Sequence, residues 1–465
     1  MREYNAQCPA VHRLNNDLLL EVFNCYRLDE KNGWNVRLGW CKLSHVCQRW
    51  RHVIYECAFH LGMQIKCTNG SPIVDTLDHL PPLPLFVDYR HTRAGFTVLT
   101  EQDELGIYHA LRLRDCVRHI DLTLPPSILR KALVLLDEQF PTLEHLSLVF
   151  PLSSKNTLPL TFPKAFLAPN LRYLRLPAIS PPRRLRFLTS TVSLVTLWLD
   201  EIQTLSYFRP RLLVARLSSL PQLEELAISF TIPIPRPSTE RELLGEQRAP
   251  VTLPSLKSLF FTGVGVYLES LAAQIRAPLL EQLFIELYNQ IVFVLPHLFY
   301  LINNTKVFKL SSATVSFHHE QVVVSTDNNQ GLGPMPFSLS VKCKSLDWQI
   351  DCASQICHGL IPTLSGVEEL SLPFFDDLRI PTEMRNGAID SATWHDLLRR
   401  FIGVRKLRIS DPCSEELSRA LQVDEVGSDP GFLPNLHFIT ARHNLFTSFI
   451  DSRQVVGRPV QFIGW

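Results

Sequence analysis

The sequence lacks the features on which several classes of protein depend. Its 465 residues contain 46 Lys and Arg against 45 Asp and Glu, a formal net charge of +1. This balance gives no general attraction to nucleic acid or to an anionic membrane, so we expect neither as a partner. The most apolar run, 279–302, contains Glu281, Glu286 and Pro296, and the two glutamates are costly at the centre of a bilayer. We therefore expect no transmembrane span.

Cysteine is present but never closely paired. The eleven cysteines are scattered singly with no C-x-x-C spacing, which argues against a zinc finger or ribbon. Cys352, Cys357 and His358 have no second spaced pair to complete a metal site. We expect reduced, structural thiols, no metal and no cofactor. Because the first residues, MREYNAQCPAVHR, have no apolar signal core, we expect an intracellular protein of the cytoplasm or nucleus.

The common catalytic motifs are also missing. The sequence has no G-x-x-x-x-G-K-[ST], no G-x-S-x-G, no H-E-x-x-H and no G-x-G-x-x-G. Without a phosphate loop, a nucleophile elbow, a metalloprotease helix or a dinucleotide fingerprint, the sequence favours a protein that is not an enzyme.

Two amphipathic segments are present near the N-terminus. In LNNDLLLEVF, 14–23, the apolar residues recur every three to four positions behind Asn and Asp residues that can cap a helix. From Leu43 to Ile54 the apolar residues fall at i, i+3, i+4, i+7 and i+11, which predicts one further helix. A module this small, 10–60, buries little surface by itself, so it must pack on the rest of the chain or on a partner.

These residues carry a family resemblance. LNNDLLLEVF followed by CKLSHVCQRWRHVI resembles the F-box, and the run from Val46 to Arg51 is its most specific part. The extended form, through DTLDHLPPLPLFVDY at 75–89, is similar to F-box proteins abundant in mushroom-forming (basidiomycete) fungi. Asn15 stands where the family usually has Pro, and the connection between the two helices is longer than in the simplest members.

The resemblance implies a docking surface for a Skp-type adaptor protein, which in turn binds a cullin–RING ligase. The alternative is that the N-terminal helices only cap the rest of the chain. The positions that match the motif, and that the resemblance assigns to adaptor binding, are Leu14, Leu18, Leu19, Val22, Phe23, Leu43, Val46, Cys47, Trp50 and Arg51.

A connector follows the helices. Segment 61–115 includes Pro72, Pro81, Pro82 and Pro84, which preclude a long helix, and LPLFVDY predicts a short strand. The apolar residues that crowd this stretch favour a packed connector with the first elements of the next domain over an exposed proline-rich ligand.

Beyond 115 a phrase recurs, (small or Pro)-x-L-x-x-L-x-L, as in FPTLEHLSLVF, APNLRYLRLPA and LPQLEELAISF. The clear copies are about 23 to 33 residues apart, with helical stretches such as 127–140 and 267–277 between them. A strand-then-helix unit stacks on its neighbours to bury its apolar face. We predict an α/β fold in 116–465, an irregular leucine-rich-repeat-like solenoid with parallel strands on the concave side and helices on the convex side. Two compact globular domains are the alternative. The Asn that usually follows the phrase is mostly absent, so we expect no regular Asn ladder.

Positions 3 and 5 of the phrase should face the concave surface, where aromatic and Arg side chains are typical of binding anchors. Segment 311–342, outside the phrase, predicts a hairpin. A weaker copy of the phrase begins at Cys343. The candidate target-binding residues are Tyr173, Arg175, Trp198, Phe260, Phe284, Lys406 and Arg408.

Together these features predict a non-catalytic substrate receptor of an SCF-type (Skp–cullin–F-box) E3 ubiquitin ligase. The helical module would bind the adaptor, and the repeats would bind a target protein. A leucine-rich-repeat scaffold without a ligase is the alternative.

Overall fold

The computed structural model describes residues 14–28, 41–57, 61, 64–70, 74, 77, 82–91, 99–150, 160–231, 250–288, 293–305, 311–327, 335–374, 391–410, 414–423 and 433–464. The chain divides into two compact units, unit 1 from Met1 to Leu199 and unit 2 from Asp200 to Trp465.

Within the described residues, unit 1 begins with helices α3 (Asn16–Leu28), α4 (Cys41–Ser44) and α5 (Gln48–Glu56). The amide of Leu18 donates to Asn15 Oδ1 at 2.8 Å, so Asn15 caps α3 as its sequence position suggests. The single helix predicted for 43–54 is wrong. Cys47 is extended, with φ −156° and ψ 169°, and its Sγ accepts from the Trp50 amide at 3.4 Å. This cap begins a separate helix, α5. The preceding helix α4 ends at Ser44, three residues before Cys47.

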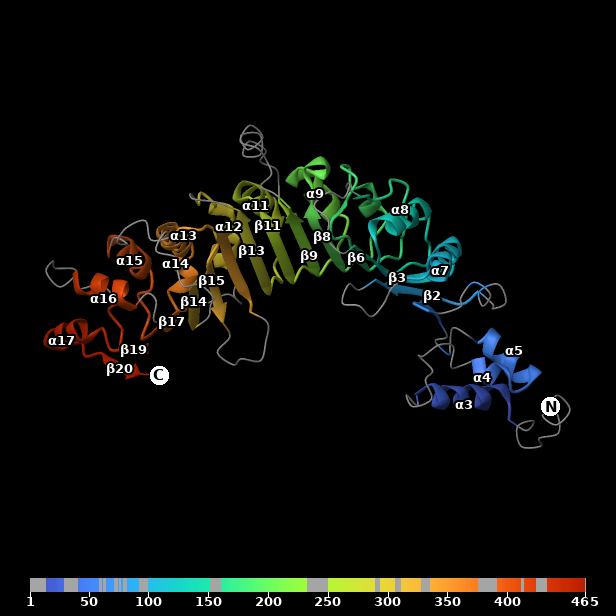
Figure 1. The fold of residues 1–465 in the computed structure, drawn as a ribbon, viewed down its shortest axis with the longest axis horizontal. Helices are drawn as coiled ribbons and strands as arrows, with labels where there is room; N and C mark the ends of the chain where they lie inside the picture. The colour runs from blue at the N-terminus through green and yellow to red at the C-terminus, as the bar shows by residue number, and fades with distance from the viewer. Residues whose placement is uncertain are drawn as a thin grey trace. The chain divides into compact units, whose positions relative to one another are not determined.

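Parallel strands form the sheet of unit 1. In spatial order they are β1 (Ile65–Thr68), β2 (Leu85–Arg90), β3 (Val117–Thr123), β4 (His145–Val149), β6 (Tyr173–Arg175) and the part of β8 (Thr196–Ile202) up to Leu199. Figure 1 shows α7 (Glu101–Arg112) and α8 (Pro126–Leu135) on one face of these strands. We call the opposite face the strand face. Short strands β5 (Leu160–Thr161) and β7 (Ile179–Ser180) pair separately.

Unit 2 repeats the arrangement. Its strands in spatial order are β9 (Glu225–Phe230), β11 (Ser258–Gly263), β13 (Gln282–Tyr288), β16 (Phe337–Lys342), β15 (Gln321–Asp327), β14 (Ser312–Phe317), β17 (Glu369–Leu372), β18 (Lys406–Ile409), β19 (Phe438–Ala441) and β20 (Gln461–Gly464). The connecting helices are α9 (Pro210–Leu217), α11 (Gly265–Ala272), α12 (Pro296–Asn304), α13 (Leu346–Gly359), α14 (Ile361–Leu364), α15 (Ser391–Leu398), α16 (Ser414–Val423) and α17 (Thr447–Val455). The short strands β10 (Val251–Thr252) and β12 (Ile275–Arg276) pair with each other, outside the main sheet.

The recurring leucines form the core, as the phrase predicts. Leucines at positions 1, 4 and 6 of three successive copies are fully buried: Leu143, Leu146, Leu148, Leu171, Leu174, Leu176, Leu194, Leu197 and Leu199. Strand-then-helix units with these residues inside give both units a leucine-rich-repeat-like α/β fold, which confirms the predicted fold class.

The predicted hairpin in 311–342 is present. Strand β15 runs antiparallel to both β14 and β16, whereas β16 is parallel to β13 and β14 is parallel to β17. One reversed strand is therefore inserted between two parallel stretches of sheet.

The prediction that the segment from Cys343 is a weaker copy of the phrase is wrong. That segment forms α13, in which Leu346, Ile350, Ala353 and Cys357 are buried. Their spacing of three to four residues is that of one helical face. The helices predicted for 127–140 and 267–277 exist but end earlier, at Leu135 and Ala272, because the chain then enters a bridge at Gln139 and strand β12.

A different set of side chains replaces the expected Asn ladder. The residue before the first leucine of the phrase donates to a carbonyl of the preceding repeat at four places. The bonds are Thr142 to Asp115 at 3.0 Å, Asn170 to Pro141 at 2.7 Å, Ser255 to Pro221 at 2.8 Å and Asn435 to Ile402 at 3.0 Å. These bonds join successive repeats where each strand begins.

Candidate functional site

The N-terminal helices enclose a small core of their own. Leu19 and Phe23 from α3 and Val53 and Ile54 from α5 are at most 2% exposed, and Leu43 from α4 is 8% exposed. Three of the ten motif residues, Leu19, Phe23 and Leu43, therefore hold the module together. Side chains enclosed in this way have little surface left for a partner.

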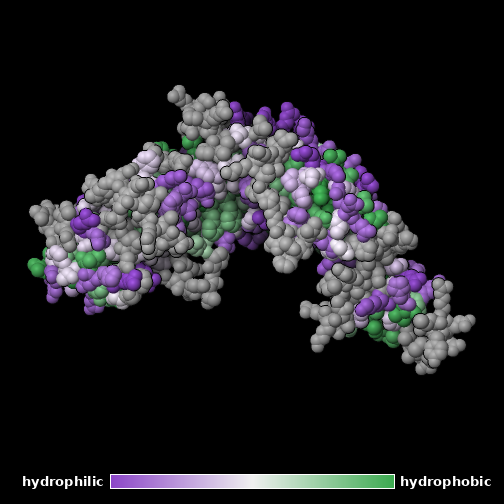
Figure 2. Space-filling view, viewed as in Figure 1, coloured by the Kyte–Doolittle hydropathy of each residue, from purple (hydrophilic) through white to green (hydrophobic). Residues whose placement is uncertain are grey.

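Three other motif residues are exposed although apolar. Leu18 is 51% exposed, Val22 44% and Val46 36%, and Leu18 and Val22 lie one turn apart on α3. We call these three residues the exposed apolar set. Figure 2 shows hydrophobic residues gathered on the surface of these helices.

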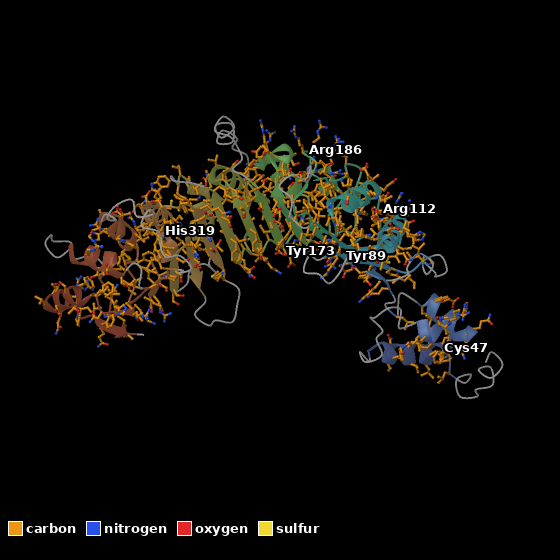
Figure 3. All side chains as sticks on the ribbon, in the orientation of Figure 1. Cys47, Tyr89, Arg112, Tyr173, Arg186 and His319 are labelled. Atoms are coloured by element: carbon orange, nitrogen blue, oxygen red, sulfur yellow. The ribbon has the colours of Figure 1, made fainter. Side chains whose placement is uncertain are left out.

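The remaining motif residues brace the helices. Trp50 packs edge-on against Phe23, with ring centroids 5.0 Å apart and planes at 71°, and joins α5 to α3. Cys47, labelled in Figure 3, caps α5. Arg51 Nε donates to the Ser44 carbonyl at 3.0 Å, and the Leu14 carbonyl accepts from Arg49 Nη2 at 2.6 Å. The ten residues thus divide into a core, a brace and an exposed apolar set.

The strand face of unit 1 carries a stack of flat rings. Phe86, His119, His145 and Tyr173 occupy matching positions on β2, β3, β4 and β6. Adjacent ring centroids lie 5.4, 4.0 and 4.2 Å apart, and the planes are within 14° of parallel. We call these four residues the ring ladder. All four are half-buried, and Figure 3 labels Tyr173 on these strands.

Charged and polar side chains border the ring ladder. The next row along the same strands holds Asp88, Asp121, Ser147, Arg175 and Trp198. The Arg175 guanidinium lies over the Trp198 ring, 4.8 Å from its centroid. Arg90 binds Asp88 through Nε and Asp121 through Nη2, each at 3.1 Å.

Burial controls the protonation of the two stacked imidazoles. Desolvation lowers the pKa of His119 below its ordinary 6.5 despite the nearby carboxylates of Asp121 and Asp88, which raise it. Desolvation, and then the neighbouring His119, lowers the pKa of His145 to about 4. Both rings are therefore neutral at physiological pH and act as flat, weakly polar surfaces.

Unit 2 carries the second pair of predicted aromatic residues. Phe260 and Phe284 lie in register on β11 and β13, with ring centroids 5.0 Å apart and planes at 3°. The row continues from Phe284 to Ser338 on β16. The strand register predicted at Phe260 is therefore the observed one. The two phenylalanine rings form a flat surface smaller than the ring ladder.

The two predicted basic residues lie on another part of unit 2. Lys406 binds Glu369 at 3.1 Å, and Arg408 is exposed beside Ser371 and Thr440 on neighbouring strands. In strand order β16, β15, β14 and β17 separate β18 from β13. The seven predicted target-binding residues thus form three groups and not one site, and their role in binding stays a prediction.

Sequence reasoning missed Phe86 and His119 and gave His145 no role. The phrase was restricted to leucine, but Val117, Ile120 and Leu122 of β3 and Val87 and Tyr89 of β2 are buried at the equivalent positions. A phrase that accepts Val, Ile and Tyr at these positions would have extended the repeats to β2 and aligned all four rings.

Other residues considered for metal binding do not cluster in the part of the chain that the structure describes. Cys352 and Cys357 are buried on α13, and His358 beside them is exposed. No three His, Cys, Asp or Glu side chains converge within the described ranges, where Cys352 and Cys357 are free thiols. Among the described helices, none has the length and apolar character needed to cross a bilayer.

Comparison with known proteins identifies no family for this chain. No family model matches the chain, and no curated protein matches it. One solved structure with a detectable likeness is the leucine-rich repeat-containing protein LegL7 from Legionella pneumophila. It is 12% identical over 86% of this chain and 99% of its own, with a TM-score of 0.26. So low a score carries no argument, and the fold rests on the strand pairing described above.

Proposed function

We propose that this protein is a non-catalytic substrate-receptor subunit of an SCF-type E3 ubiquitin ligase. In this proposal the N-terminal helices bind a Skp-type adaptor, and the repeats bind a target. The chain contributes proximity, because holding a target near a ubiquitin-charged enzyme raises its effective concentration without any bond chemistry by this chain.

The observation that carries the proposal is the division of the F-box-like residues. Leu19, Phe23 and Leu43 close a core, and Leu18 and Val22 remain exposed beside it. Apolar anchors at the centre of a protein interface dominate its affinity, whereas a module that served only as a cap would bury them against the repeats. The exposed apolar set is therefore suited to a partner helix or groove.

The test is binding to a purified Skp-type adaptor from a fungal source. We expect the double variant Leu18→Asp, Val22→Asp to bind at least tenfold more weakly, because it places two charges in an apolar contact. Trp50 is left intact, since its ring braces α5 on Phe23. Val134→Asp on α8, where the valine is 71% exposed, is the matched control.

Circular dichroism and thermal unfolding would show that both variants fold. If the intact folded chain fails to bind the adaptor, or if the double variant binds as tightly as Val134→Asp, the ligase proposal is wrong. A repeat scaffold with an N-terminal cap would then remain.

A further inference from the structure

A cation lies near each end of the ring ladder. Lys66 on β1 is in register with Phe86, and it is half-buried between the inward-facing Ile65 and Cys67. At the other end Arg175 follows Tyr173 by two residues on β6 and so lies on the same face. The strand face of unit 1 therefore presents four flat rings between two basic side chains.

These two cations lie outside the ion pairs that Arg90 forms on this face. Arg90 binds both Asp88 and Asp121, so both carboxylates already have a basic partner, although one negative charge of this group stays in excess. Among the residues that the structure describes, neither Lys66 nor Arg175 forms an ion pair, and the buried Arg175 Nε has no hydrogen-bond partner. A ligand that complements this face would place an anionic group near each end.

The spacing limits the length of that ligand. From β1 to β6 the strand order is β1-β2-β3-β4-β6, and four steps of about 4.8 Å give roughly 19 Å. An extended or polyproline peptide advances about 3.1 to 3.4 Å per residue, so about six steps cover the same distance. Proline and aliphatic side chains suit the flat apolar rings between the cations.

We propose that the strand face of unit 1 binds an extended segment of a target protein with two acidic side chains about six residues apart, separated by proline and aliphatic residues. The inference rests on the proposed function only in calling the ligand a target. The acidic side chains meet Lys66 and Arg175, and the apolar residues lie along the ring ladder.

The test uses the full chain and a fluorescein-labelled peptide, Asp-Leu-Pro-Leu-Pro-Leu-Asp, with fluorescence anisotropy as the readout. We expect the peptide with both Asp changed to Asn to bind at least fivefold more weakly. Arg175→Gln and Lys66→Gln should each weaken binding of the acidic peptide at least fivefold. Arg130→Gln, which removes an exposed cation from α8, is the matched control and should bind as the unchanged chain does.

The ring ladder is tested separately. Tyr173→Phe keeps the stacked ring and should bind normally, whereas Tyr173→Ala should weaken binding at least fivefold. The inference is overturned if the folded chain does not bind the acidic peptide, if acidic and neutral peptides bind equally, or if Arg175→Gln has no more effect than Arg130→Gln. Adaptor binding measured on the same samples separates the two proposals, because the adaptor and peptide surfaces share no residue.

Discussion

Two imidazole rings, His119 and His145, lie face to face with centroids 4.0 Å apart in the ring ladder. Phe86 and Tyr173 cover their outer faces. Asp121 and Asp88 raise the pKa of His119, and Arg90, which binds both carboxylates, lowers it. Protonating either imidazole would place a charge in a partly desolvated stack. The folded chain therefore resists uptake of these protons.

Acidification should consequently destabilise the protein through His145. An unfolded histidine binds its proton near pH 6.5, whereas the folded-state pKa of His145 is about 4. Between these values the unfolded chain holds more protons, so stability is full above pH 6.5 and declines as pH falls toward 4. We expect this residue to account for a loss of about 1 to 2 kcal/mol, a figure reduced for its partial exposure.

The measurement is denaturant unfolding at pH 7 and pH 4.5 for the unchanged chain and for His145→Phe. Phenylalanine keeps a flat ring in the stack but cannot titrate. The variant should lose less stability on acidification than the unchanged chain. Equal losses in the two proteins would show that His145 does not couple folding to pH.

At the scale of the elements, the start of each strand is held by a side chain of the recurring phrase. Asn170 donates to Pro141 of the preceding repeat at 2.7 Å, and Thr142, Ser255 and Asn435 do the same at their own repeats. Gln222 occupies the equivalent position before Leu223 but has no such bond within the described part of the chain.

Asn170→Ala should therefore lower the free energy of unfolding by about 1 kcal/mol, the usual net value of one hydrogen bond. Gln222→Ala is the matched control and should change it by less than about 0.5 kcal/mol. Urea unfolding followed by tryptophan fluorescence measures both. If Gln222→Ala lowers the free energy of unfolding as much as Asn170→Ala does, these hydrogen bonds do not stabilise the stacking of the repeats.

The elements also show what could be predicted from sequence. Leucines at positions 1, 4 and 6 predicted the core, and the alternation between them predicted the strand register, because a buried face fixes both. The break at Cys47 was missed because a thiol is a rare helix cap and the apolar spacing runs through it. The copy at Cys343 was misassigned because Leu346 and Ile350 fit a strand phrase and a helical face equally well over a short window.

The site was predicted less completely than the core. Tyr173, Arg175 and Trp198 were identified from their phrase positions, and they lie together. Phe86 and His119 were missed because their strands use Val, Ile and Tyr inside. The division of the F-box-like residues into core, brace and exposed apolar set could not be predicted, since one apolar stripe contains all three and only the helix packing separates them.

At the scale of the whole molecule, each repeat packs mainly on the repeats before and after it, and such proteins lose structure locally. Leu407 on β18 is fully buried, and its neighbours in register are Leu370 on β17 and Ile439 on β19. A cavity at this position should loosen these three strands first.

We expect Leu407→Ala to cost about 2 to 5 kcal/mol locally and to speed hydrogen exchange in β17, β18 and β19. Exchange in β3, β4 and β6 should stay as in the unchanged chain. Ile402→Ala, at a side chain that is 53% exposed, is the control. Exchange that rises equally in every strand would mean that the chain unfolds as one cooperative block.

The reversed strand β15 also affects how the protein is made. Strand β13 ends at Tyr288, but its next neighbour in the sheet, β16, begins only at Phe337. A ribosome that adds about 5 to 20 residues per second takes roughly 2 to 10 seconds to synthesise the segment between them, during which one edge of β13 has no neighbour. Nascent chains arrested within that segment should be digested by protease at β13 more readily than chains in which β16 has left the ribosome.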